Sequence, residues 1–91
     1  MVPLQNFATS VLADIVRRQP PSDARTSFAW NVAVGPALAR STTVTLSDGV
    51  LTVRARDARW AKEVERARDT ILKRMQHLLG ASSVVRMVIE P

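Results

Sequence analysis

The side chains best suited to chemistry in this sequence are six basic residues between positions 54 and 73. Guanidinium and ammonium groups bind phosphate oxygens through charge-assisted hydrogen bonds, which is how proteins hold a nucleic-acid backbone. On a helical projection four of the six fall in one narrow band, although an ordinary solvated charged face would have the same pattern. The candidate nucleic-acid contacts are Arg54, Arg56, Arg59, Lys62, Arg66 and Lys73.

The overall charge agrees with a polyanionic or acidic partner. The 91 residues carry a net charge of +5, and eleven of the thirteen basic residues are arginine. Arginine is well suited to planar, bidentate contacts with phosphate or carboxylate. Charge of this kind indicates a class of partner and not one particular partner.

The inventory of reactive groups argues against catalysis. The chain has no cysteine, and its single histidine, His77, falls on the basic band of the projection. A nucleophile–base pair or a transition-metal cluster needs more such groups than this. No glycine-rich phosphate loop is present either. We therefore predict a non-enzyme without cofactor, metal or small-molecule substrate.

A β-hairpin and a long helix would position the basic residues. Asp48-Gly49 is typical of a two-residue hairpin turn, which requires positive φ at both central positions. This turn pairs Ser47 with Val50 and places the apolar residues of both strands on one face. Asp57 is then placed to cap a helix over residues 58–79, which ends at Gly80. Arg68 lies inside the apolar arc of that helix, so we expect it to reach Glu65 or a backbone carbonyl.

Two further helical segments are predicted before the hairpin. Apolar residues from Leu4 to Val16 recur with helical spacing, and Pro20-Pro21 ends that helix. A second helix begins at Ser22, is interrupted by Gly35-Pro36, and continues as a short helix over residues 37–40.

The chain closes with a β-branched run over residues 82–90, which predicts a third strand. Three helices on one face of a three-stranded sheet would leave its other face open. That face would carry Thr43, Thr45, Thr52, Arg54 and Arg86, with Arg56 at its margin.

Both tryptophans are predicted to pack in the core, Trp30 at the helix bend and Trp60 against the hairpin. Each also has a second interpretation, as a stacking platform or a contact for a partner. The candidate partner contacts are Trp30, Trp60 and Arg86.

The sequence predicts a single α+β domain over residues 1–91. No apolar run approaches the roughly 20 residues that a membrane span requires. The first segment lacks the pattern of a secretory signal, and a cytoplasmic location is the default expectation.

Four segments together resemble the DciA family of small bacterial proteins. They are Trp30-x-x-x-Val34-Gly35-x-x-Leu38-Ala39-x-x-Thr42, Asp48-Gly49-Val50-Leu51-Thr52-Val53, Asp57-x-x-Trp60-Ala61-x-Glu63 and Leu78-Leu79-Gly80. The resemblance covers nearly the whole chain. It implies a KH-like fold with the order α-α-β-β-α-β, and a role in loading or operating the replicative helicase DnaB.

The sequence departs from related patterns in two ways. Many DciA-family members carry a long basic or disordered extension, whereas this chain ends at Pro91, so we expect a near-minimal domain or a short paralogue. A KH domain that binds RNA clamps the backbone with a Gly-x-x-Gly loop, and no two glycines here have that spacing. Any nucleic-acid contact must therefore use charged side chains.

The resulting hypothesis is a DciA-like, non-catalytic domain that binds nucleic acid weakly, DNA in preference to RNA, and a protein partner such as DnaB. A second interpretation is a protein-interaction or self-association module without nucleic-acid binding. A third is an RNA- or ribosome-associated KH-like factor.

Overall fold

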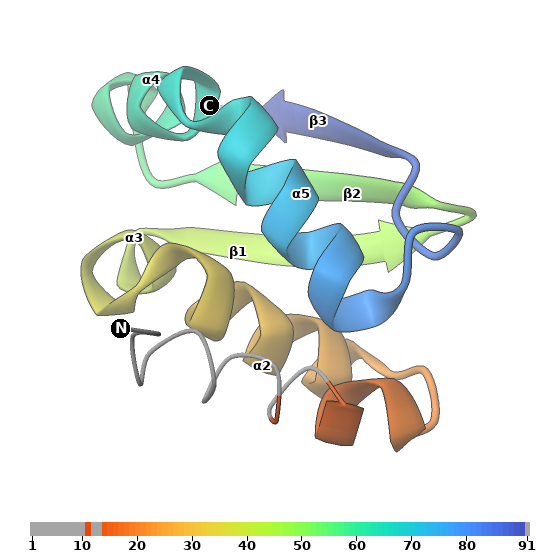
Figure 1. Cartoon of the computed structure of the whole chain (residues 1–91). Helices are drawn as coiled ribbons and strands as arrows, with labels where there is room; N and C mark the ends of the chain where they lie inside the picture. Colours follow the sequence, from red (N-terminus) through yellow and green to blue (C-terminus); the bar gives the residue numbers. More distant parts are fainter. Residues whose placement is uncertain (1–10, 12–13, 91) are drawn as a thin grey trace, which may run out of the picture.

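The computed structural model describes residue 11 and residues 14–90. Figure 1 shows the arrangement of the elements along the chain. Residues 14–18 are helical, and the rest of the predicted first helix lies largely outside the described residues. The elements that follow are α2 Asp23–Val34, α3 Pro36–Arg40, β1 Thr42–Ser47, β2 Val50–Ala55, α4 Ala58–Arg66, α5 Arg68–Leu79 and β3 Arg86–Glu90.

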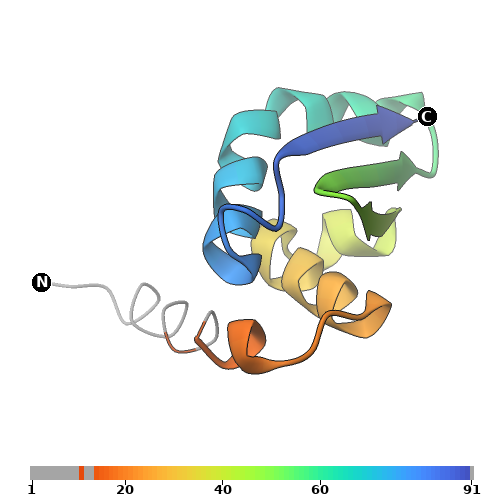
Figure 2. The ribbon, with the colours of Figure 1, turned by 90° about the vertical axis from the view of Figure 1, so that its right-hand side faces the viewer.

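The sheet has the order β1-β2-β3, with β1 antiparallel and β3 parallel to the central strand. Its helices cover one face, and Figure 2 shows the other face uncovered. This confirms the predicted α+β class and the three-stranded sheet with helices on one side. Among the described helices, none is long and apolar enough to cross a membrane. The core between the layers includes Ala29, Trp30, Leu51, Val53, Val64, Ile71, Met75, Leu78, Val84 and Met87.

The hairpin has the predicted register. Ser47 pairs with Val50, and Leu46 pairs with Leu51. Asp48 and Gly49 have φ values of 51° and 79°, as a turn with two left-handed residues requires. The turn residues and the alternation of apolar residues therefore favour the same register.

Substitution of Gly49 by alanine is expected to lower the free energy of unfolding by about 1–2 kcal/mol. A Cβ atom at this position would sit 3.0 Å from Cγ2 of Val85, in addition to the strain of positive φ. Asp48→Asn is the matched control, because asparagine tolerates the left-handed region. Urea unfolding would measure both variants, and equal effects would contradict this account of the turn.

Trp30 is buried, with 2% of its surface exposed. Its indole Nε1 donates a 2.8 Å hydrogen bond to Oγ1 of Thr42, and that hydroxyl donates to the carbonyl of Leu38 at 2.7 Å. The tryptophan thus joins α2, α3 and the start of β1. Its packing role is as predicted, and its interpretation as a stacking platform is wrong because the ring is inside the core.

The predicted long helix is divided at Ala67, which has φ −100° and ψ 11°. Neither glycine nor proline occurs at this point, so the break has no local signal in the sequence. Its origin is tertiary, because α4 packs on β2 and β3 whereas α5 packs mainly against α2. The expectation of one continuous helix over residues 58–79 is therefore corrected, although the cap by Asp57 is confirmed by its 3.1 Å bond from the Trp60 amide.

The third strand is shorter than the predicted run and begins at Arg86. Residues 81–83 form a turn, so Val84 is buried before the strand begins, whereas Val85 is 66% exposed. Strict alternation across residues 82–90 therefore does not hold.

The N-terminal helical segment differs from expectation too, since Val16 is buried but Val11 and Ile15 are about half exposed.

Arg68 satisfies both predicted alternatives at once. Its Nη2 lies 2.7 Å from Oε2 of Glu65, and its Nη1 donates to the carbonyl of Met87 at 2.6 Å. The hydrogen bond from Arg68 lowers the pKa of the Glu65 carboxyl, and the same bond raises the pKa of Arg68. Arg68 therefore ties the start of α5 to the outer edge of β3.

Arg68→Met is expected to lower the free energy of unfolding by about 1–2 kcal/mol near pH 7. The pKa of Glu65 is lower in the folded than in the unfolded protein. The Glu65–Arg68 pair therefore contributes fully to the free energy of unfolding above the ordinary pKa of 4.5, and this contribution is lost as the pH falls through the lower pKa of the folded state. The difference between wild type and variant should therefore shrink near pH 3. Urea unfolding at both pH values would test this.

Arg66→Met is the control for that comparison. The Arg66–Glu63 pair is 3.8 Å apart and solvent-exposed, so its loss should cost less than about 0.5 kcal/mol. Equal losses for the two variants at both pH values would contradict the role given to Arg68.

Candidate functional site

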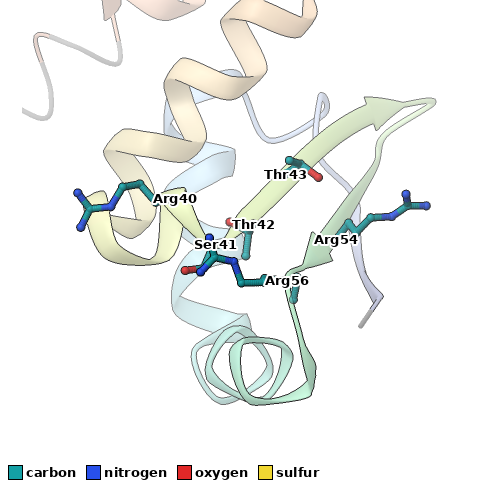
Figure 3. A pocket seen from close by; sticks show the side chains of 7 residues that line it. Arg40, Ser41, Thr42, Thr43, Arg54 and Arg56 are labelled. Carbon is teal, nitrogen blue, oxygen red and sulfur yellow. The ribbon is translucent and has the colours of Figure 1, made fainter.

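Three arginines surround a hollow of about 350 Å³ at the end of the sheet where β1 begins and β2 ends. We call Arg40, Arg54 and Arg56 the basic corner. Ser41, Thr42, Thr43 and Ala55 complete the lining, which contains no acidic residue. In Figure 3 the side chain of Arg56 lies near Ser41, whereas Arg40 and Arg54 project to either side. The hollow therefore presents hydroxyl groups flanked by positive charge.

The local fold explains how these residues meet. Gly35, with φ 85°, ends α2 and lets α3 turn back toward the sheet, so that Arg40 is the last residue of α3. The amide of Arg56 donates a 2.8 Å hydrogen bond to the carbonyl of Ser41, which joins the end of β2 to the end of α3. Thr43 pairs with Arg54 across the hairpin. Two backbone contacts thus fix the positions from which the arginine side chains extend.

The open face of the sheet continues from this corner. Cross-strand pairing arranges its side chains in three rows that run across β1, β2 and β3. A second hollow of about 230 Å³ lies at the row nearest the basic corner, where Glu90 is the only acidic lining residue. The rows are Thr43–Arg54–Glu90, Thr45–Thr52–Val88 and Ser47–Val50–Arg86.

The structure separates the six predicted phosphate contacts into groups. All six are exposed. Arg54 and Arg56 belong to the basic corner, whereas Arg59, Lys62 and Arg66 lie on α4. Lys73 lies on α5, beyond the break at Ala67, so the straight projection that aligned it with the α4 residues does not hold. On α4, Nη1 of Arg66 lies 3.8 Å from Oε1 of Glu63, so the carboxylate partly balances the charge of Arg66.

The candidate partner contacts also divide. Trp30 is withdrawn from the set, because a side chain that is 2% exposed has no surface to offer a partner. Trp60 is only partly buried, which corrects the expectation of burial, and the Arg59 guanidinium lies 5.7 Å from its ring centroid. Arg86 is exposed at the far end of the open face from Arg54, because Val50 pairs with Arg86 and Arg54 with Glu90.

Arg40 is the residue that sequence reasoning missed. It ends a short helix that carries no obvious charge pattern, and its approach to Arg54 and Arg56 depends on the bend at Gly35. The predicted helix over residues 37–40 placed the arginine directly before the hairpin, which is the one signal available. Among the described residues, no group of three His, Asp or Glu side chains lies close enough to hold a metal ion.

The fold and this site define a small α+β domain with an arginine-rich corner beside an open sheet face. The family described as "Dna[CI] antecedent, DciA" matches residues 3–89, and the chain belongs to that family. The comparison with curated proteins finds no match. Membership in the DciA family implies a role in replication like that of a loader of the DnaB helicase, in association with DnaB. The family is non-catalytic, which agrees with the predicted absence of enzyme activity.

Proposed function

We propose that this protein is a cytoplasmic replication factor that binds nucleic acid through its basic corner and binds the replicative helicase DnaB as its protein partner. The observation that carries the nucleic-acid half is that Arg40, Arg54 and Arg56 all line a single hollow. Family membership supports the helicase half.

The electrostatics of the corner favour phosphate as its ligand. None of its three arginines forms an ion pair with an acidic side chain in the described part of the chain, where the ion-paired arginines are Arg18, Arg66 and Arg68. A phosphate at Arg40 or Arg56 would therefore not compete with a paired carboxylate, whereas at Arg54 it would lie near Glu90, the cross-strand neighbour. Arg59, on the first turn of α4, would extend the contact along the backbone, and Lys62, Arg66 and Lys73 would add weaker, more distant attraction.

The open face supplies no stacking platform. Its nine residues include no aromatic side chain, so bases would not be held as they are on sheets that bind single strands with aromatics. Contacts to the phosphate backbone would then dominate, which predicts weak sequence preference and strong salt dependence.

Fluorescence anisotropy with labelled DNA and RNA oligonucleotides tests the nucleic-acid half, with binding expected at low salt and progressive loss as salt rises. No binding at low salt would refute it. Sedimentation of the intact chain with and without purified DnaB tests the helicase half separately, and a failure to co-sediment would refute that half alone.

A protein-interaction module without nucleic-acid binding is the second candidate. The exposure of Val85 and Val88, at 66% and 37%, favours it, since both lie on or beside the open face. In that case DnaB would co-sediment while the oligonucleotides would not bind. The two measurements therefore separate the candidates.

A further inference from the structure

The two edges of the sheet are unequal. The outer edge of β3 is blocked at Met87, whose carbonyl accepts a hydrogen bond from Arg68. β1 forms the opposite edge of the sheet (Figure 1), where α2 and α3 pack against the strand. Among the described residues, no group forms a comparable hydrogen bond to the outward backbone of Val44 or Leu46 in the middle of β1. Natural proteins commonly block a sheet edge that must not pair with another chain, and an edge with free backbone groups can bind a further strand.

The register identifies the free backbone groups of β1. In a two-residue hairpin the residues that flank the turn, Ser47 and Val50, exchange hydrogen bonds, and bonded pairs then alternate along the strands. Thr45 therefore bonds to β2, whereas the N–H and C=O groups of Val44 and Leu46 point outward. Neither residue's backbone forms a hydrogen bond outside the sheet ladder with any other described residue.

Side-chain burial agrees with an accessible edge. Val44 and Leu46 face the helices but remain partly exposed, whereas their cross-strand partners Val53 and Leu51 are fully buried. The helices therefore cover the centre of the sheet more completely than they cover β1. The outward groups of Val44 and Leu46 are about 7 Å apart along the strand, which is the repeat that an added strand presents.

Charge indicates what kind of strand would fit. The basic corner lies beside the start of β1, and the hollows that adjoin this strand contain three arginines and a single carboxylate, Glu90. We propose that β1 binds an extended, acidic segment of a partner protein as a fourth strand, with Val44 and Leu46 pairing its backbone and Arg40 contacting its carboxylates. This inference rests on the partner-protein half of the proposed function and does not require the nucleic-acid half, although both use Arg40.

Amide hydrogen exchange of the intact chain tests the edge directly. In the free protein, the amides of Val44 and Leu46 should exchange faster than that of Thr45, which is paired with β2. Slow exchange at Val44 and Leu46 in the free chain would show an occupied edge and overturn the proposal.

The binding probe is a synthetic peptide of alternating valine and threonine with two glutamates at one end. Binding should protect the amides of Val44 and Leu46 selectively. A peptide with lysine in place of glutamate, and one N-methylated at alternate amides, should each bind at least about tenfold more weakly. Absence of protection at millimolar peptide, or protection elsewhere, would overturn the proposal.

Charge reversal supplies a matched pair of variants. Arg40→Glu should weaken binding of the acidic peptide about tenfold, whereas Arg18→Glu makes the same change in net charge at a residue paired with Asp14. Equal weakening by both would indicate only general attraction and would refute the specific contact. Val44→Pro, which removes one outward donor and is tolerated on strand edges, should weaken binding without changing oligonucleotide affinity.

Purified DnaB separates this inference from the proposed function. DnaB could bind wild type and Val44→Pro equally and leave the amides of Val44 and Leu46 unprotected. In that case DnaB is a partner but does not bind the β1 edge, so the inference fails while the helicase half of the proposed function holds. If DnaB does not bind but the acidic peptide protects Val44 and Leu46, the inference stands and the helicase half of the proposed function fails.

Discussion

Replacement of Trp30 by alanine is expected to lower the free energy of unfolding by about 3–5 kcal/mol. The ring is 2% exposed and packs where α2, α3 and β1 meet, so its removal leaves a cavity that three elements would have to close. Native proteins have total stabilities of about 5–15 kcal/mol, so this one substitution would remove a large share of the total. Circular dichroism during urea unfolding measures the change.

Trp30→Phe is the control for this substitution. It keeps an aromatic ring in the core but loses the Nε1 donor to Thr42, so we expect a smaller loss of about 1–2 kcal/mol. If alanine cost no more than phenylalanine, the packing role of the indole would be refuted. Loss of partner binding in Trp30→Ala would follow from unfolding and would not restore Trp30 as a surface contact.

The triple substitution of the basic corner, Arg40→Ala, Arg54→Ala and Arg56→Ala, is expected to have the largest effect on nucleic-acid binding. If each arginine contacts one phosphate, the slope of log affinity against log salt should decrease in magnitude by about 2–3. When salt is raised from about 50 to 200 mM, the part of the affinity that depends on three such contacts falls about 20- to 40-fold, and the variant should lack this part of the decrease. Anisotropy titrations at several salt concentrations provide the slopes.

The comparison variant carries three alanines on the long basic band, at Lys62, Arg66 and Lys73. These residues lie on two helices separated by the break at Ala67, so their removal should reduce the slope by less than 1 if the contact is centred on the corner. A larger change from this variant than from the corner variant would move the interface to the helices. All three corner residues are exposed, so the corner variant should keep its fold.

The features that local chemistry controls were predictable from the sequence. Asp48-Gly49 and the alternating apolar residues act together on the hairpin register, and Asp57 accepts a hydrogen bond from the amide three residues later. Gly35-Pro36 separates α2 from α3 because helical geometry is disfavoured before proline. Each of these depends on residues that are close together along the chain.

The features that were missed depend on contacts between distant segments. The break at Ala67 arises where α4 packs on the sheet and α5 on α2, and no breaking residue marks it. Arg40 joins Arg54 and Arg56 only after α3 has folded against the start of β1. Trp60 lies on an apolar arc, yet the way α4 sits on the sheet leaves it partly exposed. Helical projections do not contain this information.

The parallel pairing of β3 with β2 has a consequence for the order of folding. A hairpin closes within about 1–10 μs, but β3 joins its neighbour only after a crossover that contains both α4 and α5. We expect the hairpin to be formed in the transition state and β3 to dock after it. Val53→Ala should then mainly slow folding, and Met87→Ala should mainly accelerate unfolding. Stopped-flow kinetics of the two variants would show whether the last strand closes the core.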